Sequence, residues 1–245
     1  MPRYQAEGMD FGYTEFGEGP ALVLIHGWGA SGQEWHEVGW VSAVGEGRRL
    51  LIPDVRGHGS SAKPHEAEAY APARLGQDVL ALLDAAGVEE ADLLGYSMGA
   101  AIALWAVLLA PHRVRSLVVG GVPDEDVDAR VAAGKALRGN GPMTPRAREY
   151  QGWALAQPGN DLLALAACLE GGLELPPYEE LAVFGGEAFV AAGTLDRRFD
   201  AGQRLASRLP GGRFLALEGD DHMGAFEDVR LHDAVREFLA EVSPL

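Results

Sequence analysis

The stretch that decides the fold is LLGYSMGAA, residues 93–101, in which a G-x-S-x-G pattern lies between an apolar run and an alanine-rich run. Residues 91–94 predict a short buried strand, and residues 100–110 predict a helix that ends before Pro111. A serine between such elements lies on a sharp turn that exposes its hydroxyl, while the flanking glycines allow close packing. The pattern therefore indicates a nucleophilic Ser97; a structural turn serine, in a chain with 33 glycines, is the alternative.

Similar apolar runs on both sides of this stretch predict a parallel sheet. They lie at residues 21–25, 50–52, 116–122, 187–192 and 213–217. Helical spacing of apolar residues predicts helices at 74–86, 200–208 and 231–242, and alternation over residues 1–20 predicts two antiparallel strands. Strands that alternate with helices in this way form a sheet that is covered on both faces. We therefore expect an α/β fold with a mostly parallel sheet of about eight strands, the first pair antiparallel.

The alternation of strands and helices is interrupted once, over residues 124–180. This segment predicts three helices, at 127–137, 145–156 and 161–169, separated by joints rich in Gly and Pro, and no convincing strand. We expect one domain over residues 1–245, with a small helical lid at 124–180 that folds over the strand ends. Several large side chains of the lid either line an acyl pocket or pack its helices together: Met143, Tyr150, Trp153, Leu155 and Leu162.

The acidic composition excludes some classes of partner. The net charge is −16, and the Lys and Arg residues are scattered without forming a basic block. This charge opposes phosphate backbones and anionic membranes, so we expect neither nucleic acid nor a membrane as a partner. No apolar run approaches the ~18 residues of a membrane span, and residues 1–7 contain no apolar export segment, so a cytoplasmic location is expected. The single cysteine, Cys168, excludes an internal disulfide, and its apolar setting predicts a buried side chain.

Two residues late in the chain supply the groups that a nucleophilic serine needs. A base must take the serine proton, and a third group must orient that base. His222 is expected on a loop after the strand at 213–217, and Asp196 closes the strand at 187–192. The order Ser97, Asp196, His222 and the shared sheet edge predict a catalytic triad. The other candidates for the acid are Asp124, Asp200, Asp220 and Asp221.

An oxyanion hole requires backbone N–H groups close to the nucleophile. One is expected from Met98, which follows Ser97, and the other from Trp28, in the loop after the strand at 21–25. His26 and Gly27 would shape that loop.

The remaining histidines are expected to have no part in the chemistry. His58 follows the strand at 50–52 and, with Asp54 and Arg56, is expected to hold its loop together. Four others lie in polar or helical contexts and are expected to face solvent: His36, His65, His112 and His232.

These motifs, in this order, resemble the series found in the α/β-hydrolase superfamily. The matching stretches are residues 24–29 (LIHGWG), 54–61 (DVRGHGSS), 95–99 (GYSMG), 193–196 (GTLD) and 219–222 (GDDH). The chain is similar to small bacterial members with a short helical lid, a group of carboxylesterases, enol-lactonases and cofactor-free haloperoxidases or perhydrolases. Residues 26–29 also resemble the pimeloyl-ester carboxylesterases of biotin synthesis. The resemblance implies a serine hydrolase without metal or organic cofactor that cleaves a small to medium carboxylic ester. We expect the chain to act as a monomer or a homodimer.

Other functions of the same triad stay open. The GYSMG stretch and the pattern Gly193-x-x-Asp196-x-x-Phe199 are similar to a menaquinone-pathway lyase, whose family usually places an arginine four residues after the nucleophile. That position is Ala101 here, so a substrate carboxylate would lose its clamp. A lactonase, a perhydrolase and a non-catalytic ligand receptor on the same fold are the further alternatives, because one fold hosts many functions.

Overall fold

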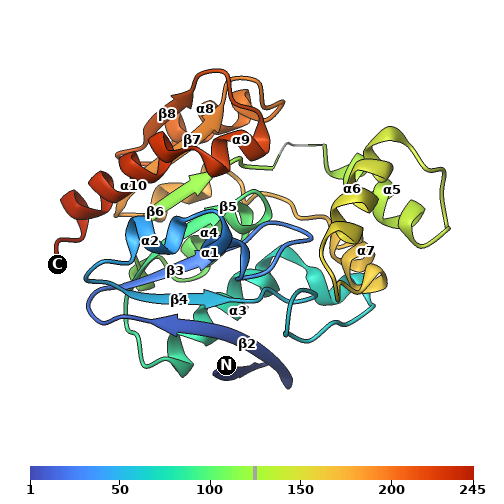
Figure 1. Cartoon of the computed structure of the whole chain (residues 1–245), viewed down its shortest axis with the longest axis horizontal. Coiled ribbons are helices and arrows are strands. Elements are labelled where there is room, and N and C mark those ends of the chain that lie inside the picture. Colours follow the sequence, from blue (N-terminus) through green and yellow to red (C-terminus); the bar gives the residue numbers. More distant parts are fainter. Residues whose placement is uncertain (124–125) are drawn as a thin grey trace.

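An eight-stranded sheet forms the centre of the structure (Figure 1). The computed structural model describes residues 1–123 and 126–245. The strand order is β1-β2-β4-β3-β5-β6-β7-β8; β2 is antiparallel to both neighbours, and the strands from β4 across to β8 are parallel. The strands are β1 (Arg3–Ala6), β2 (Met9–Phe16), β3 (Ala21–Ile25), β4 (Arg49–Pro53), β5 (Ala91–Tyr96), β6 (Val114–Gly120), β7 (Glu187–Gly193) and β8 (Arg213–Leu217). The expected mostly parallel sheet, with its first pair antiparallel, is confirmed.

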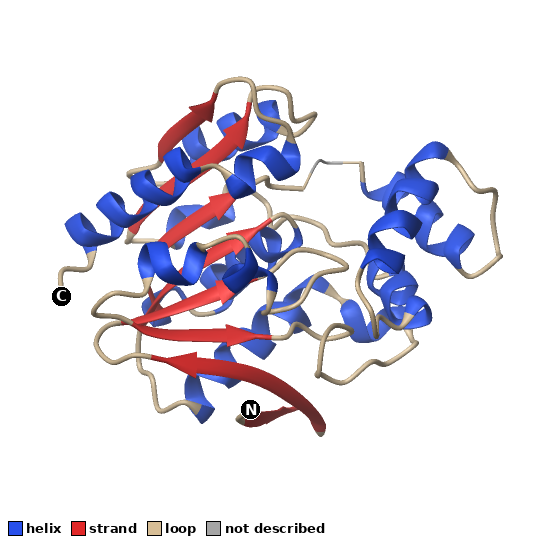
Figure 2. Cartoon of the chain, viewed as in Figure 1, coloured by secondary structure: helices blue, strands red, loops and turns tan. Residues whose placement is uncertain are grey.

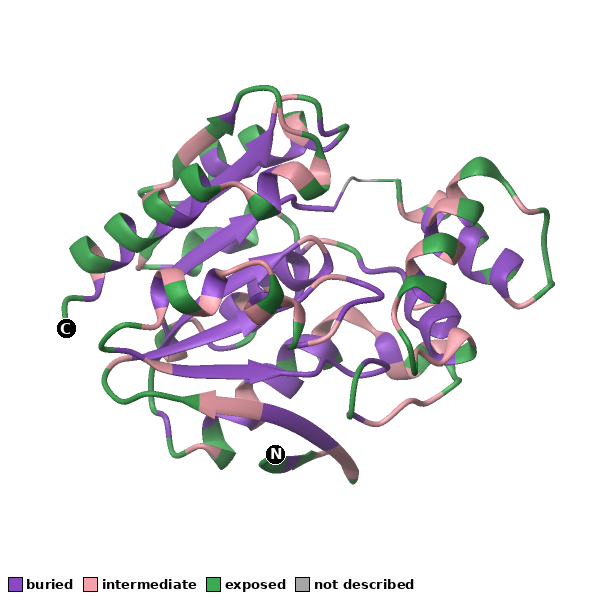
Figure 3. Cartoon of the chain, viewed as in Figure 1, coloured by how far each residue is buried: buried purple, intermediate pink, exposed green. Residues whose placement is uncertain are grey.

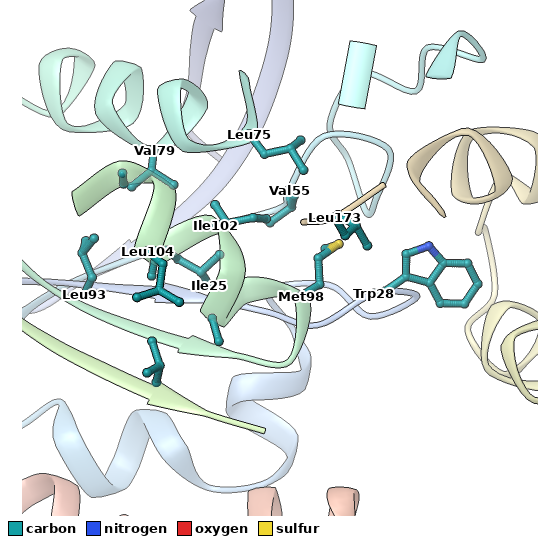
Figure 4. Close-up of a cluster of buried hydrophobic side chains, with 14 of the residues drawn as sticks. Ile25, Trp28, Val55, Leu75, Val79, Leu93, Met98, Ile102, Leu104 and Leu173 are labelled. Atoms are coloured by element: carbon teal, nitrogen blue, oxygen red, sulfur yellow. The ribbon is translucent and has the colours of Figure 1, made fainter. Parts of the chain in front are cut away.

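The central strands are buried on both faces, and successive residues contribute to two separate hydrophobic clusters. In β3, Leu22 and Leu24 pack with one cluster, whereas Val23 and Ile25 pack with the other. This alternation follows from the two-residue period of a strand. The cluster that contains Ile25 continues through Leu93 and Met98 to Trp28 (Figure 4). Burial is concentrated in the central strands β3 to β7, whereas the edge strands β1 and β8 are mostly exposed or half-buried (Figure 3).

Helices cover both faces of the sheet (Figure 2). Side chains of α3, α4 and α8 pack on the face of Ile25, and those of α1, α2, α9 and α10 pack on the face of Leu24. The helices are α1 (Glu34–Glu37), α2 (Trp40–Val44), α3 (Pro72–Ala85), α4 (Met98–Leu109), α5 (Val127–Leu137), α6 (Pro145–Ala156), α7 (Leu162–Glu170), α8 (Phe199–Arg208), α9 (His222–Glu227) and α10 (Val229–Val242). None of the helices in the described part of the chain combines the length and the apolar composition that a membrane span requires.

The segment predicted at 124–180 contains three helices, α5, α6 and α7, between β6 and β7. Residues 124 and 125, where the predicted segment begins, lie outside the described residues. Side chains cap the first turns of these helices: Asp126 accepts from the amide of Ala129, and Thr144 from that of Ala147. We call residues 126–186 the insertion. It lies beyond the carboxyl ends of the parallel strands (Figure 1), and its Cys168 is fully buried, as expected.

The prediction that His232 faces solvent is wrong. Its side chain is buried, with the imidazole ring 4.2 Å from the ring of Trp40. The residues on the buried side of α10 are Leu231, His232, Val235, Phe238 and Leu239. Spacings of three and four residues place this histidine on the apolar stripe of the helix, which outweighs its polarity.

A buried ionic network ties the last helix to the sheet. Asp92 in β5 is fully buried and accepts hydrogen bonds from Arg48 at 3.4 Å and from Ser116 at 2.8 Å. Arg48 is also buried and donates to the carbonyl oxygens of Leu239 and Ser243 at the end of α10. Asp92 also pairs with Arg115 at 3.2 Å, whereas the charge of the buried Arg48 is compensated by Asp92.

We expect Asp92→Ala to lower the free energy of unfolding by about 3–5 kcal/mol, because it leaves the Arg48 guanidinium buried without its counter-ion. Urea unfolding followed by circular dichroism measures this loss. The matched control is Asp84→Ala, because Asp84 pairs with Arg113 but is 68% exposed. That change should cost less than ~1 kcal/mol. Equal losses in the two variants would contradict the assignment of stability to the buried network.

Candidate active site

Ser97 lies at the turn between β5 and α4, as the sequence predicts. Its backbone has φ 55° and ψ −117°, a conformation that is rare for a residue with a side chain. The neighbouring glycines make this turn possible. A Cβ at Gly99 would lie 1.9 Å from the carbonyl oxygen of Ile25, and one at Gly95 would lie 2.2 Å from that of Gly99. Any side chain at either position would force the strands and α4 apart.

A chain of hydrogen bonds joins the three residues predicted as the triad. The Nε2 atom of His222 lies 3.1 Å from the Oγ atom of Ser97, and its Nδ1 atom lies 2.6 Å from Oδ2 of Asp196. The Asp196 side chain is 1% exposed and that of His222 is 13% exposed. Because the carboxylate can only accept, Nδ1 carries the proton, which leaves the Nε2 lone pair facing the serine hydroxyl.

The surroundings favour a neutral histidine beside a charged carboxylate. Burial lowers the pKa of His222; the hydrogen bond to Asp196 opposes this effect, and the charge of Arg198 adds to it. Burial alone would raise the pKa of Asp196, but its interactions with His222 and then Arg198 outweigh that effect and lower the pKa. His222 is therefore available as a base at neutral pH.

Arg198 belongs to this site although no sequence pattern pointed to it. Its backbone amide and its Nη1 atom both donate to Oδ1 of Asp196, at 3.0 and 3.2 Å. This leaves Oδ2 for His222. Arg198 lies two residues after Asp196, and this spacing is the signal by which the sequence could have suggested its role.

We expect Arg198→Gln to move the acidic limb of the pH–activity profile upward by ~0.5–1 pH unit. Activity needs neutral His222 and falls as the pH drops through its pKa. Removing the nearby positive charge raises that pKa, so activity is lost at a higher pH than in the wild type. The measurement is kcat/KM from pH 4.5 to 9. Arg197→Gln is the control, because Arg197 is 42% exposed and its smaller effect on the pKa of His222 is screened by solvent. Equal shifts in both variants would contradict a specific role of Arg198.

Tyr96 and two glycines fix the position of the histidine. The Tyr96 hydroxyl donates to the backbone carbonyl of His222 at 2.5 Å. Gly120 ends β6, and a Cβ on it would lie 2.6 Å from the ring of Tyr96. Gly121 follows, and a Cβ there would lie 2.6 Å from Cε1 of His222. Gly121 also has φ +55°, so two separate constraints favour glycine there. The turn after β6 therefore makes room for the imidazole ring.

Trp28 and Met98, whose amides are predicted to form the oxyanion hole, line the same cavity as Ser97. Met98 is the first residue of α4, where a helix leaves its N–H groups without partners. Gly27 precedes Trp28, and a Cβ on it would lie 3.4 Å from Cβ of Ser97. Within the described residues, neither the amide of Trp28 nor that of Met98 has a hydrogen-bond partner in the protein. In this part of the chain both amides thus have a free N–H, and the assignment of an oxyanion hole to them stays a prediction.

The loop after β4 supports this arrangement, as expected for His58, Asp54 and Arg56. Asp54 accepts hydrogen bonds from the amides of Gly32 and Ser60. Arg56 is fully buried and forms an ion pair with Asp78 at 2.7 Å. Burial lowers the pKa of His58 to about 3, so this histidine is neutral.

A cavity of about 170 Å³ opens at the candidate triad. The insertion contributes Tyr150 and Trp153 to its wall, which fits one of the two roles expected for these side chains. Leu155 is 71% exposed and is not part of the wall. Met143 and Leu162 pack against the core, as Tyr150 and Trp153 also do, but they are not part of the wall. Most of the lining is apolar or aromatic, as in pockets for small organic ligands.

Three charged residues also line the cavity: Glu34, Arg130 and Arg198. Burial, with smaller effects of Glu37 and Glu227, raises the pKa of Glu34 to about 7. Arg130 is buried and donates to the carbonyl oxygens of Gly172 and Leu173. Among the described residues, no group of three or more His, Cys, Asp or Glu side chains is arranged to hold a metal ion.

The other candidates for the acid do not occupy the position of Asp196. Asp221 caps α9, where its Oδ1 atom accepts from the amide of Gly224 at 2.8 Å. The prediction that His222 lies on a loop is wrong, because His222 is the first residue of the short helix α9. Asp220 pairs with the exposed Arg230, and Asp200 is exposed in α8. Asp124 lies outside the described residues.

Comparison with known proteins is consistent with this architecture. Residues 20–139 match a family model described as alpha/beta hydrolase fold. The chain is 38% identical over 110 residues to a pimeloyl-[acyl-carrier protein] methyl ester esterase of Aeromonas hydrophila. The matched region covers 45% of this chain and 41% of that protein. It is 34% identical over 117 residues to an epoxide hydrolase of Caballeronia sordidicola, covering 47% of this chain and 35% of that protein. The chain thus spans well under half the length of these curated relatives.

The similarity in three dimensions extends over nearly the whole chain. The crystal structure of a hydrolase from Pseudomonas aeruginosa superposes with a TM-score of 0.79 at 27% identity and covers 96% of both chains. The sheet, the helices and the insertion therefore have counterparts in a solved structure, whereas the sequence match to the esterase covers 45% of this chain.

Proposed function

We propose, starting from the membership of this chain in the α/β-hydrolase superfamily, that it is a serine esterase that cleaves a small to medium carboxylic ester. The observation that carries this proposal is the hydrogen-bonded chain from Ser97 through His222 to Asp196 beside two unpaired backbone amides. Hydrolytic activity is also what its relatives have in common, and one of them is named as an ester esterase. An assembled triad of this kind supports catalysis over a ligand receptor on the same fold.

The geometry supports a two-step mechanism. Oγ of Ser97 attacks the ester carbonyl carbon while its proton moves to Nε2 of His222. The amides of Trp28 and Met98 hold the oxyanion that forms. The C–O bond to the alcohol then breaks as His222 returns the proton to the leaving oxygen. Water, deprotonated by the same histidine, then attacks the carbonyl carbon of the acyl-enzyme. The C–O bond to Ser97 breaks as His222 returns the proton to Oγ, which releases the acid, and Asp196 stabilises the imidazolium in both steps.

The identity of the nucleophile favours an ester over an epoxide, although several relatives are named epoxide hydrolases. Attack by the Ser97 oxygen on an epoxide carbon would open the ring and form an alkyl ether. That ether has no carbonyl group for water to attack, so the enzyme would stay alkylated after one reaction. Attack on an ester instead gives an acyl-enzyme, which water can cleave. Ser97 therefore supports acyl transfer.

The test is to identify the acyl-enzyme and the residue that carries it. We expect p-nitrophenyl acetate, butyrate and octanoate to give steady turnover and, where deacylation is slow, a burst of one p-nitrophenolate per active site. A fluorophosphonate probe should label the tryptic peptide 75–113, in which Ser97 is the only serine. Heat-denatured protein is the control, because an unactivated serine does not react.

Each other outcome favours a different reaction. A label on Ser97 without turnover of simple esters would contradict the esterase proposal and favour a lactonase, a lyase or a perhydrolase on the same triad. The absence of label and of turnover, together with tight binding of a ligand, would favour a receptor. We also propose that the insertion acts as the lid of a single domain, because its Tyr150 and Trp153 close one wall of the cavity.

A further inference from the structure

The loop that presents the Trp28 amide is held at three consecutive peptide groups. His26 donates from Nδ1 to the carbonyl of Gly27 at 2.8 Å, and this carbonyl belongs to the same peptide group as the Trp28 amide. His58 accepts at Nε2 from the amide of Gly29 at 3.0 Å. Both histidines are buried in the body of the fold, and burial lowers the pKa of each, so both stay neutral.

The third peptide group is held by the insertion. Asn160, in the link between α6 and α7, donates from Nδ2 to the carbonyl of Gly29 at 2.8 Å. The same nitrogen donates at 3.1 Å to the carbonyl of Ala154, which lies in the last turn of α6. Both partners are carbonyl oxygens, so the amide group must face them with its NH₂ end. Asn160 therefore ties the loop to two parts of the insertion at once.

The side chain of Trp28 makes a second connection to the insertion. Its indole N–H donates to the carbonyl of Leu165 in α7 at 3.1 Å. Its ring meets that of Tyr150 in α6 edge to face, with 4.9 Å between the centroids. In Figure 4 Trp28 extends from the end of the hydrophobic cluster toward helices of the insertion.

We infer that Asn160 is a positioning residue for catalysis. Its hydrogen bonds join the Gly27–Ala30 loop to the lid, so the position of the lid determines the position of the loop and of the Trp28 amide. This inference rests on the proposed function. Hydrogen-bond donors in an oxyanion hole act only when they are held at the correct distance before the reaction. A displaced lid would release one of the three supported peptide groups and the Trp28 indole together. The oxyanion hole is then complete only while the lid is closed on the substrate.

The test separates catalysis from binding. Asn160→Ala is expected to lower kcat for p-nitrophenyl butyrate at least ~10-fold while KM changes less than ~2-fold, because a misplaced donor weakens only the transition state. The rate constant for fluorophosphonate labelling of Ser97 should fall by a similar factor. Asn140→Ala is the matched control, because Asn140 is the other asparagine of the chain and is exposed in the same insertion. It should leave kcat, KM and labelling unchanged.

A second variant covers the case in which Asn160→Ala does not fold, as judged by thermal unfolding. Trp28→Phe keeps an aromatic ring against Tyr150 but removes the indole N–H, and it should also lower kcat more than it raises KM.

The inference is overturned if the variants keep kcat within twofold of the wild type, or if only KM rises, since the lid would then merely enclose the substrate. A wild type that is labelled but cleaves no ester refutes the esterase proposal alone, and the ratio of labelling rates still tests Asn160. A wild type that is neither labelled nor active overturns both.

Discussion

Ser97→Ala is expected to lower kcat for p-nitrophenyl butyrate by ~10⁵-fold or more, because the attacking oxygen is removed and no acyl-enzyme can form. The folded structure should be retained. Alanine keeps the Cβ atom of serine, so the backbone at φ 55° is strained equally in both proteins. Residual turnover would come from the two backbone amides and from substrate binding, which do not depend on the hydroxyl.

Steady-state assays with a long incubation measure this loss, and unfolding in urea shows that the variant is folded. Ser207→Ala is a suitable control, because Ser207 is exposed in α8 and its hydroxyl donates to the carbonyl of Arg204, a residue outside the candidate triad. The control should have the activity of the wild type. Wild-type turnover by Ser97→Ala would refute the proposed mechanism for every substrate tested.

Asp196→Asn is expected to lower kcat by ~10³–10⁴-fold, as the wrong histidine tautomer does in other triads. The reason lies in Arg198, which donates twice to Oδ1 of Asp196. An asparagine there places its carbonyl oxygen toward these donors and its NH₂ group toward Nδ1 of His222. The histidine must then accept at Nδ1 and carry its proton on Nε2, so that it cannot deprotonate Ser97. We therefore expect Asp196→Asn to be no more active than Asp196→Ala.

The tautomer can be observed directly by ¹⁵N NMR of the imidazole ring, alongside kcat. Asp200→Asn is the control, since Asp200 was another candidate for the acid and is exposed in α8. It should keep wild-type activity. If Asp196→Asn were active and the Asp200 variant were not, the assignment of the acid would be wrong.

The sheet and the positions of the candidate triad follow from the sequence because each depends on local patterns. Continuous apolar runs give the buried strands, and the glycines at 95 and 99 are required by contacts at the turn itself. Short elements were harder to predict. No pattern indicated α1, α2 or α9, because four to six residues are too few for a helical period, and Asp221 was read as a possible acid although it caps α9.

The residues that support the candidate site were missed for a different reason. Asn160 and Gly29 are separated by 131 positions, and only the folded chain shows that they are in contact. Tyr96 likewise acts through a distant residue, His222, so its place in the GYSMG motif did not reveal its role. Arg198 lies only two positions after Asp196, but no known pattern marks it. Hydrophobic periodicity fixes the orientation of an element, but it does not specify which polar groups meet across the ends of the strands.

The insertion begins and ends on neighbouring strands, since β6 and β7 pair in register from Ser116 and Glu187 to Gly120 and Ala191. A segment inserted between such strands can be exchanged or lengthened at little cost, because its ends are already held together by the sheet. Substrate range can therefore diverge within a lineage while Ser97, Asp196 and His222 stay unchanged. A lid taken from another protein should support catalysis here only if it carries groups equivalent to the Asn160 amide and the Leu165 carbonyl.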